Sequence, residues 1–211
     1  MTLFVQAFRY AGEPFFFAYA GRSDAKAAYA LVMRYFVIAG VAIFLLVTLY
    51  IDFFKYFIGE EYRQGLAVVP VLLLANLCLG VYVNLSVWYK LSDRTGLGAW
   101  VAIAGAAVTI ALNILWIPEW GYMGSAWATL VCYAFMTIVS WGLGRYFYPV
   151  PYPLIKIAFY LGLGVALYFL SPFMQMYWQM SVWSSATACM LFYLLVVSLS
   201  DVRSLLRRRA V

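Results

Sequence analysis

The chain has 211 residues, of which 67% are hydrophobic and only 10% are charged, and its mean hydropathy is +0.91. A water-soluble domain carries about 45–50% apolar and about 25% charged residues, so this composition excludes a soluble globular protein. The formal net charge is +6, but the positive residues form short clusters between long apolar runs. That pattern is typical of membrane topology and argues against nucleic-acid binding. We therefore predict an integral membrane protein.

Apolar runs of about the length that a helix needs to cross a bilayer core follow one another along the chain. They predict about seven transmembrane helices, at 2–20, 29–51, 66–89, 97–117, 121–143, 154–171 and 180–200. A transmembrane β-barrel is disfavoured, because its strands are about ten residues long and alternate apolar with polar residues. The expected fold is all-α and polytopic. Pro118 and Gly121 predict a tight turn between the fourth and fifth spans, and small residues such as Gly105 and Gly124 predict close helix packing there.

Lys and Arg residues divide unequally between the two sides of the predicted membrane. One side carries Arg22, Lys26, Lys90, Arg94, Arg145, Lys156, Arg203, Arg207, Arg208 and Arg209, and the other carries only Lys55 and Arg63. Because basic loops stay in the cytoplasm, we predict that the C-terminus is cytoplasmic and that the first span enters from outside. Arg34 lies about one turn inside the second span and is expected to extend to the headgroups rather than to form part of a site.

Two charged residues one helical turn apart, Arg9 and Glu13, interrupt the first span. Burying an ionised side chain in hydrocarbon costs at least about 2.5–3.5 kcal/mol, so such a pair is a candidate functional site. Gln6 and Tyr10 share its helix face, and Pro14 can kink the helix. Two interpretations stay open: an ion pair that only fixes helix packing, or the cationic wall of a polar cavity.

The third span carries a second polar pattern. Asn76, Gly80 and Asn84 recur every four residues and Lys90 follows at the end. Such a stripe avoids lipid, because its polar groups need a hydrogen-bonding partner. It can serve helix packing or line a cavity, and the spacing alone does not decide between them.

Residues for catalysis are scarce. The chain contains no His, and its three cysteines lie inside apolar runs without a CxxC spacing. It has no nucleotide-binding glycine motif, no nucleophile elbow and no paired carboxylates of the kind that sugar chemistry requires. We therefore expect no enzymatic activity, no cofactor and no metal.

Several motifs together resemble one family. The stretch 112–129 reads LNILWIPEWGYMGSAWAT and looks like the LN–IP–G–GSA–AT stretch of Wzx-like polysaccharide and O-antigen flippases, within the multidrug/oligosaccharidyl-lipid/polysaccharide exporter superfamily. The segments 84–90 and 6–17, together with Gly59 and Tyr62, are similar to the same branch in the form found in Bacteroidota.

The resemblance implies a two-lobed transporter of about 12 to 14 helices. Residues 1–144 would then form a partial C-terminal lobe without its first helix, and 145–211 two extra spans with a basic cytoplasmic tail. The N-terminal lobe would be a missing partner. The implied function is flipping of a lipid-linked oligosaccharide, of the undecaprenyl-diphosphate type, across the bacterial inner membrane for polysaccharide or lipopolysaccharide biosynthesis.

The resemblance also implies roles for individual residues. Arg9, and less strongly Lys90, would bind the anionic diphosphate, while Glu13 would orient Arg9 or couple transport to an ion. Sugar hydroxyls would be held by Gln6, Tyr10, Asn76 and Asn84. The alternatives are a cation-coupled multidrug antiporter of the same superfamily, or an inactive membrane fragment that only packs with other helices and with membrane lipids. A glycan polymerase or ligase is disfavoured because it needs a large outer loop.

Overall fold

The computed structural model describes the backbone of residues 1–209 and the side chains of residues 1–56 and 58–200. Over this range the chain is helical without a strand, as predicted. The long helices are α1 (Thr2–Tyr19), α2 (Ala25–Leu49), α4 (Val69–Leu91), α5 (Thr95–Phe147), α6 (Leu154–Trp178) and α7 (Val182–Arg209). Three short elements connect α2 to α4, namely α3 (Ile51–Phe54), η1 (Lys55–Phe57) and η2 (Glu60–Val68).

Within the described residues, five helices are long and apolar enough to cross a membrane: α2, α4 together with η2, α5, α6 and the part of α7 up to Ser200. The chain is therefore an all-α, multi-pass membrane protein. Helix α1 is not among the five, which corrects the predicted first span. It forms over nearly the predicted residues, but Gln6, Arg9 and Glu13 lower its mean hydropathy, since each is strongly polar.

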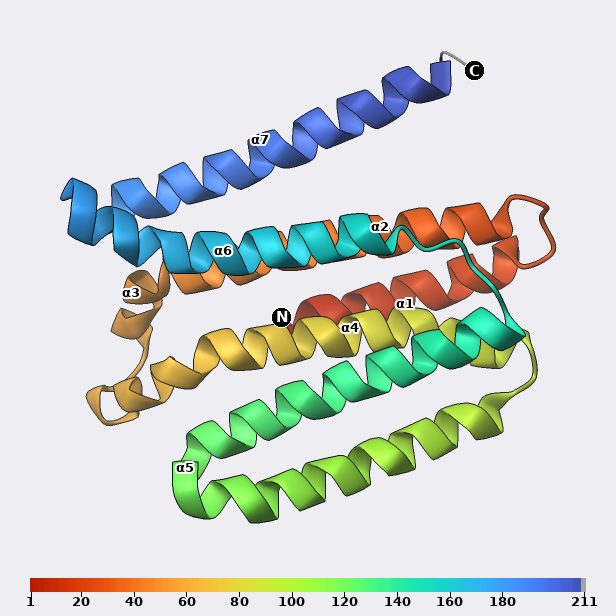
Figure 1. The fold of residues 1–211 in the computed structure, drawn as a ribbon, viewed down its shortest axis with the longest axis horizontal. Helices are drawn as coiled ribbons and strands as arrows, with labels where there is room; N and C mark the ends of the chain where they lie inside the picture. Colours follow the sequence, from red (N-terminus) through yellow and green to blue (C-terminus); the bar gives the residue numbers. More distant parts are fainter. Residues whose placement is uncertain (210–211) are drawn as a thin grey trace.

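The predicted fourth and fifth spans are the two limbs of α5. Gly121 separates them with φ 54° and ψ −136°, a backbone conformation that only glycine adopts readily. The limbs run back alongside each other as a hairpin (Figure 1). They approach closely at small residues: a Cβ at Gly124 would lie 2.5 Å from the Trp116 carbonyl oxygen, and one at Gly105 would lie 2.6 Å from the Met136 sulfur. The predicted tight turn and close packing are confirmed.

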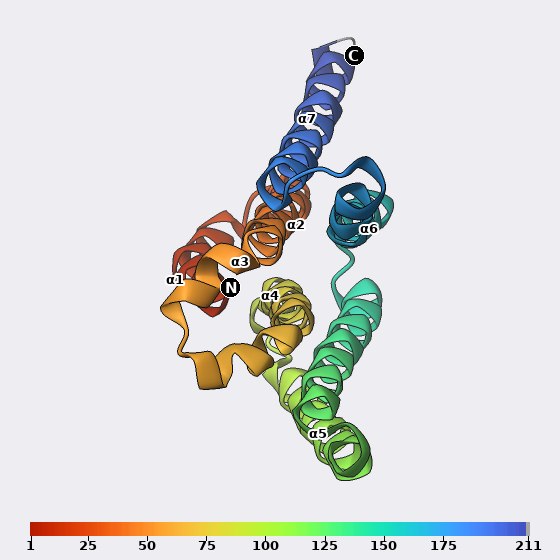
Figure 2. The ribbon, with the colours of Figure 1, turned by 90° about the vertical axis from the view of Figure 1, so that its left-hand side faces the viewer.

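Helices α2 and α4 lie at the centre of the bundle. Helix α1 packs on both of them, α6 and α7 pack on α2, and α5 packs on α4 (Figures 1 and 2). The contact between α2 and α4 depends on glycines, because a Cβ at Gly80 would collide with the Phe36 ring and one at Gly40 with Leu77. This confirms a packing role for Gly80 within the predicted stripe.

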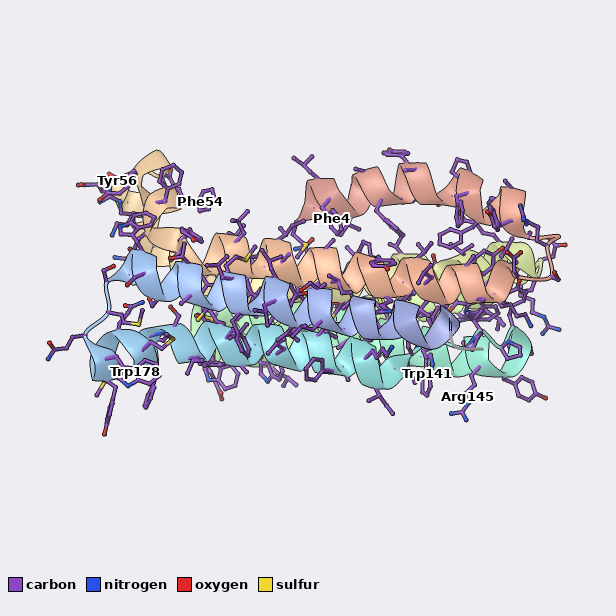
Figure 3. All side chains as sticks on the ribbon, turned by 90° about the horizontal axis from the view of Figure 1, so that it is seen from above. Phe4, Phe54, Tyr56, Trp141, Arg145 and Trp178 are labelled. Atoms are coloured by element: carbon purple, nitrogen blue, oxygen red, sulfur yellow. The ribbon has the colours of Figure 1, made fainter. Side chains whose placement is uncertain are left out.

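The loops gather at two ends of the bundle, as the alternation of spans requires (Figure 1). One end, called here the basic end, carries Arg22, Lys26, Lys90, Arg94, Arg145 and Lys156, with the acids Asp24 and Asp93. The other, the acidic end, carries Asp52, Glu60, Glu61 and Glu119, with the bases Lys55 and Arg63. Phe54, Tyr56 and Trp178 lie at the acidic end (Figure 3), where aromatic residues suit a membrane interface.

Two predictions concern the C-terminal part of the chain. The predicted boundary between residues 144 and 145 falls in the last turn of α5. The basic tail from Arg203 to Arg209 lies outside the described side chains. Helices α6 and α7 share one apolar core with α2 and α4, in which Leu77, Tyr160 and Tyr193 are almost fully buried. The two C-terminal helices are thus packed on the rest of the bundle.

Candidate functional site

Helix α1 lies along both α2 and α4 and brings Glu13 to Lys90 of α4. It runs parallel to α4: the Thr2 hydroxyl donates to Asn76 Oδ1 at 3.1 Å near one end, and Glu13 meets Lys90 near the other. It runs antiparallel to α2, with the rings of Phe16 and Tyr29 5.0 Å apart. The helix continues through Pro14 without ending. Its N-terminus therefore lies part-way along the bundle, and its C-terminus lies at the basic end (Figure 1).

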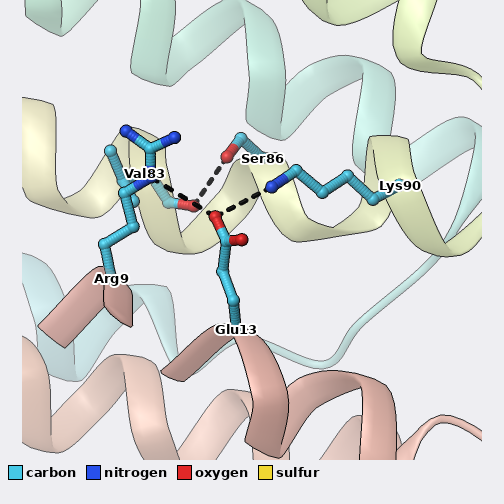
Figure 4. Close-up of polar contacts among 5 residues, drawn as sticks. All are labelled: Arg9, Glu13, Val83, Ser86 and Lys90. Carbon is cyan, nitrogen blue, oxygen red and sulfur yellow. Dashed lines mark hydrogen bonds and ion pairs between the residues drawn. The ribbon is translucent and has the colours of Figure 1, made fainter. Parts of the chain in front are cut away.

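Three charged side chains meet between α1 and α4. Glu13 Oε1 accepts hydrogen bonds from Lys90 Nζ at 2.8 Å and from Arg9 Nε at 3.3 Å (Figure 4). The predicted Arg9–Glu13 pair thus forms, but Glu13 also pairs with a second cation, Lys90. The cluster carries a formal charge of +1. All three side chains are partly exposed, so the cluster is open to a ligand from outside the bundle.

The Arg9 guanidinium is positioned to bind an anion. Among the described side chains it donates to Glu13 through Nε, and its two terminal nitrogens point away from that carboxylate (Figure 4). A guanidinium presents a planar fork of donors that matches phosphate or carboxylate oxygens. Ser86, which lies nearby on α4, donates its hydroxyl to the Val83 carbonyl at 2.7 Å. It is therefore engaged by its own helix.

The other predicted residues of α1 do not join this cluster. Val5, Gly12 and Phe16 form the buried face of the helix, whereas Gln6 and Tyr10 are exposed, with Tyr10 at 78%. The predicted common face is thus divided: Glu13 turns toward α4, while Gln6 and Tyr10 point outward. Their position leaves them available only to a ligand or partner on the outer surface of α1.

The two asparagines of the polar stripe on α4 lie in different surroundings, away from the charge cluster. Asn76 contacts Thr2 and donates to the Leu72 carbonyl at 2.8 Å. It precedes Lys90 by 14 residues, or about 21 Å of helix, so it lies far from the charge cluster. Asn84 is only 2% exposed, and neither atom of its amide has a hydrogen-bonding partner among the residues that the structure describes. The structure therefore brings together Arg9, Glu13 and Lys90, and separates Asn76 and Asn84 from them.

Asn84 borders a small cavity near the basic end. The cavity measures about 10 Å³ and is lined also by the aromatic side chains of Tyr29, Trp88, Tyr148 and Tyr152. That volume is about the minimum for one water molecule. Tyr152 lies in the α5–α6 connection, and burial raises the pKa of its phenol, so it stays a neutral hydrogen-bond donor. A water here would satisfy an amide that the described residues leave without a partner.

Arg34 is a residue whose role the sequence reasoning missed. The predicted extension to the headgroups is wrong: Arg34 is only 6% exposed. Its Nη2 lies 3.4 Å from the Tyr160 hydroxyl of α6 and 3.4 Å from the Ser200 hydroxyl of α7. Arg34 thus joins α2 to the two C-terminal helices. Tyr160 and Ser200 lie more than 120 residues away, so no local pattern could have indicated this contact.

Comparison of the chain with protein-family models, with curated proteins and with solved structures gives no match. The charge cluster combines two cations and one carboxylate, with an outward-facing guanidinium on a helix that packs along the side of the bundle. Such an arrangement can bind an anionic group, because hydrogen bonds between ionised partners are stronger than those between neutral ones.

Proposed function

We propose that this protein takes part in moving a lipid-linked oligosaccharide from the cytoplasmic to the outer leaflet of a bacterial inner membrane. The observation that carries the proposal is the Arg9–Glu13–Lys90 cluster, which has an excess of positive charge and an outward-facing guanidinium. The motif resemblance of residues 112–129 to polysaccharide flippases supports the same substrate class. This role requires no catalytic residue, cofactor or metal.

The diphosphate of such a substrate is the part that binding must stabilise away from water. Arg9 would hold its oxygens through both terminal nitrogens, and Glu13 would keep the guanidinium in that orientation through Nε. Lys90 adds a second positive charge within 2.8 Å of the same carboxylate. A diphosphate bound here would therefore meet two cations, which reduces the cost of bringing its charge into the membrane.

The outer face of α1 would contact the sugars and the N-terminal lobe that the resemblance implies. Gln6 and Tyr10 lie on that face and are exposed, so both can hydrogen-bond to a ligand there. Asn76 and Asn84 have no such position, and their predicted role in binding sugar is not part of the proposal. A cavity between α1 and a facing lobe would be lined by Gln6, Arg9 and Tyr10.

The cation antiporter alternative fits the cluster less well. A site for an organic cation needs an excess of negative charge, whereas Glu13 already accepts from two cations. An inactive fragment would restore no surface polysaccharide to a strain that lacks this gene, even without a substitution.

Complementation of surface polysaccharide in a strain that lacks this gene tests the proposal. We expect Arg9→Ala to reduce surface polysaccharide at least tenfold, and Arg9→Lys, which keeps the charge but loses the fork, to reduce it less. Arg22→Ala is the matched control, because Arg22 pairs with Asp24 in the α1–α2 connection. Membrane levels of each variant are measured by immunoblot. Wild-type polysaccharide in cells carrying Arg9→Ala would refute the proposal.

A further inference from the structure

An apolar groove of about 320 Å³ lies between the second limb of α5 and α6, with α2 and α4 behind it. Its volume falls within the range of about 300–1,000 Å³ that is typical of ligand sites. Leu85 and Cys78 of α4 lie in its lining, and Ile138 of α5 and Leu154 of α6 form its outer edges. Ile138 is 64% exposed and Leu154 is 43% exposed, so the groove opens on the side of the bundle.

The groove exists because α5 and α6 are joined only by residues 148–153 and pack on different helices, α5 on α4 and α6 on α2. Figure 2 shows this arrangement, with α5 and α6 on the opposite side of α4 from α1. The groove is therefore separate from the Arg9–Glu13–Lys90 cluster. All its lining helices belong to spans long and apolar enough to cross the membrane, so its opening faces lipid.

A cation lies at the basic end of the groove. Trp141 lines the groove, and Arg145 follows one turn later on α5 with its guanidinium 5.7 Å from the Trp141 ring centre (Figure 3). A smaller cavity continues from the groove toward Arg145 and shares Leu85, Trp141 and Tyr152 with it. Arg145 is exposed, and no carboxylate among the described side chains pairs with it. The groove is thus apolar along its length and positive at one end.

We propose that this groove binds one acyl chain of an anionic glycerophospholipid, whose phosphate is held by Arg145. An apolar groove open to a bilayer offers water no hydrogen-bonding partners, whereas a hydrocarbon chain fills it and makes dispersion contacts along its walls. The anionic headgroup complements the Arg145 charge, and Trp141 beside it suits the interface depth. The lipid fills the space between α5 and α6 and joins them. This inference does not depend on the proposed transport function.

Photo-crosslinking in vesicles of the reconstituted full chain tests this site. The probes are phosphatidylglycerol and phosphatidylcholine that carry a diazirine in one acyl chain, and adducts are located by peptide mass spectrometry. We expect adducts on residues 137–141 and 154–161, with a yield at least threefold higher for phosphatidylglycerol. Arg145→Gln should make the two yields equal. Ala158→Trp, which fills the groove, should reduce adducts at both segments at least fivefold.

Ala166→Trp is the matched control, because Ala166 is exposed on α6 and lies outside the groove lining. Ile138→Trp is a second filling variant if Ala158→Trp does not fold, as judged by gel filtration. Equal adduct yields in the filling variants and in the control would overturn the inference, as would equal yields of the two probes in the wild type. Displacement of the probe by a polyisoprenyl phosphate, but not by unlabelled phosphatidylglycerol, would overturn the choice of a glycerophospholipid.

Discussion

At the scale of single residues, Glu13 joins α1 to α4 by accepting from Lys90 across the helix interface. We expect Glu13→Gln and Lys90→Gln each to lower the free energy of unfolding, and the double variant to lose less than their sum. Because the side chains are partly exposed, the coupling should be about 0.5–1 kcal/mol. Denaturant titration of the four proteins in micelles measures it. Strictly additive effects would show that the 2.8 Å contact does not form in the membrane protein.

Asn84 differs from Glu13, since its buried amide has no hydrogen-bonding partner within the described part of the chain. Asn84→Leu should leave the thermal unfolding midpoint unchanged or raise it, because a side chain of similar volume removes polar atoms that cost free energy to bury. Asn84→Asp should destabilise the protein by about 1–3 kcal/mol, because it buries a carboxyl group without a hydrogen-bonding partner. A large loss of stability in Asn84→Leu would mean that the amide has a partner, such as a bound water.

At the scale of elements, the contact of α4 with α2 and α1 depends on Gly80. A Cβ there would meet the Phe36 ring, which Phe4 and Phe8 hold in place at centroid distances of 5.1 and 4.5 Å. We expect Gly80→Ala to cost about 1–3 kcal/mol of unfolding free energy by overpacking. Gly162→Ala in α6 is the control, because a Cβ there meets nothing within 4 Å. It should be neutral or stabilise the helix by up to about 1 kcal/mol. Equal effects of the two substitutions would contradict the close packing.

At the scale of the whole molecule, the separation of basic and acidic ends predicts the orientation in the membrane. In a background without Cys78, Cys132 and Cys189, cysteines are introduced at Gly21 and Pro151 of the basic end and at Glu119 of the acidic end. A membrane-impermeant maleimide added to intact cells should label only the cysteine at 119, because basic loops stay in the cytoplasm. Labelling at 21 and 151 but not at 119 would reverse the topology.

Local sequence patterns were sufficient to predict most of the helices. The apolar runs predicted α2 and α4 to within four residues of their observed bounds and the starts of α6 and α7 to within two, because an apolar run of spanning length forms a helix whatever its neighbours are. Helices α6 and α7 continue past their predicted ends at 171 and 200. Gly121 predicted the bend in α5 for an equally local reason, its positive φ. Helix α1 was correctly predicted as a helix but wrongly predicted as a membrane span. The error arose because Gln6, Arg9 and Glu13 were not weighed against the apolar residues around them.

The sequence by itself determined that this is an all-α, multi-pass membrane protein with its charges divided between two ends, since span length, turn residues and loop composition are all encoded locally. Only the tertiary structure decided which groups meet. It brought Lys90 into contact with Glu13, which is 77 residues away in the sequence, and buried Arg34 against α6 and α7. It also left a groove between α5 and α6. A repeat of polar residues assigns side chains to a helix face, but the partner of that face depends on how whole helices pack.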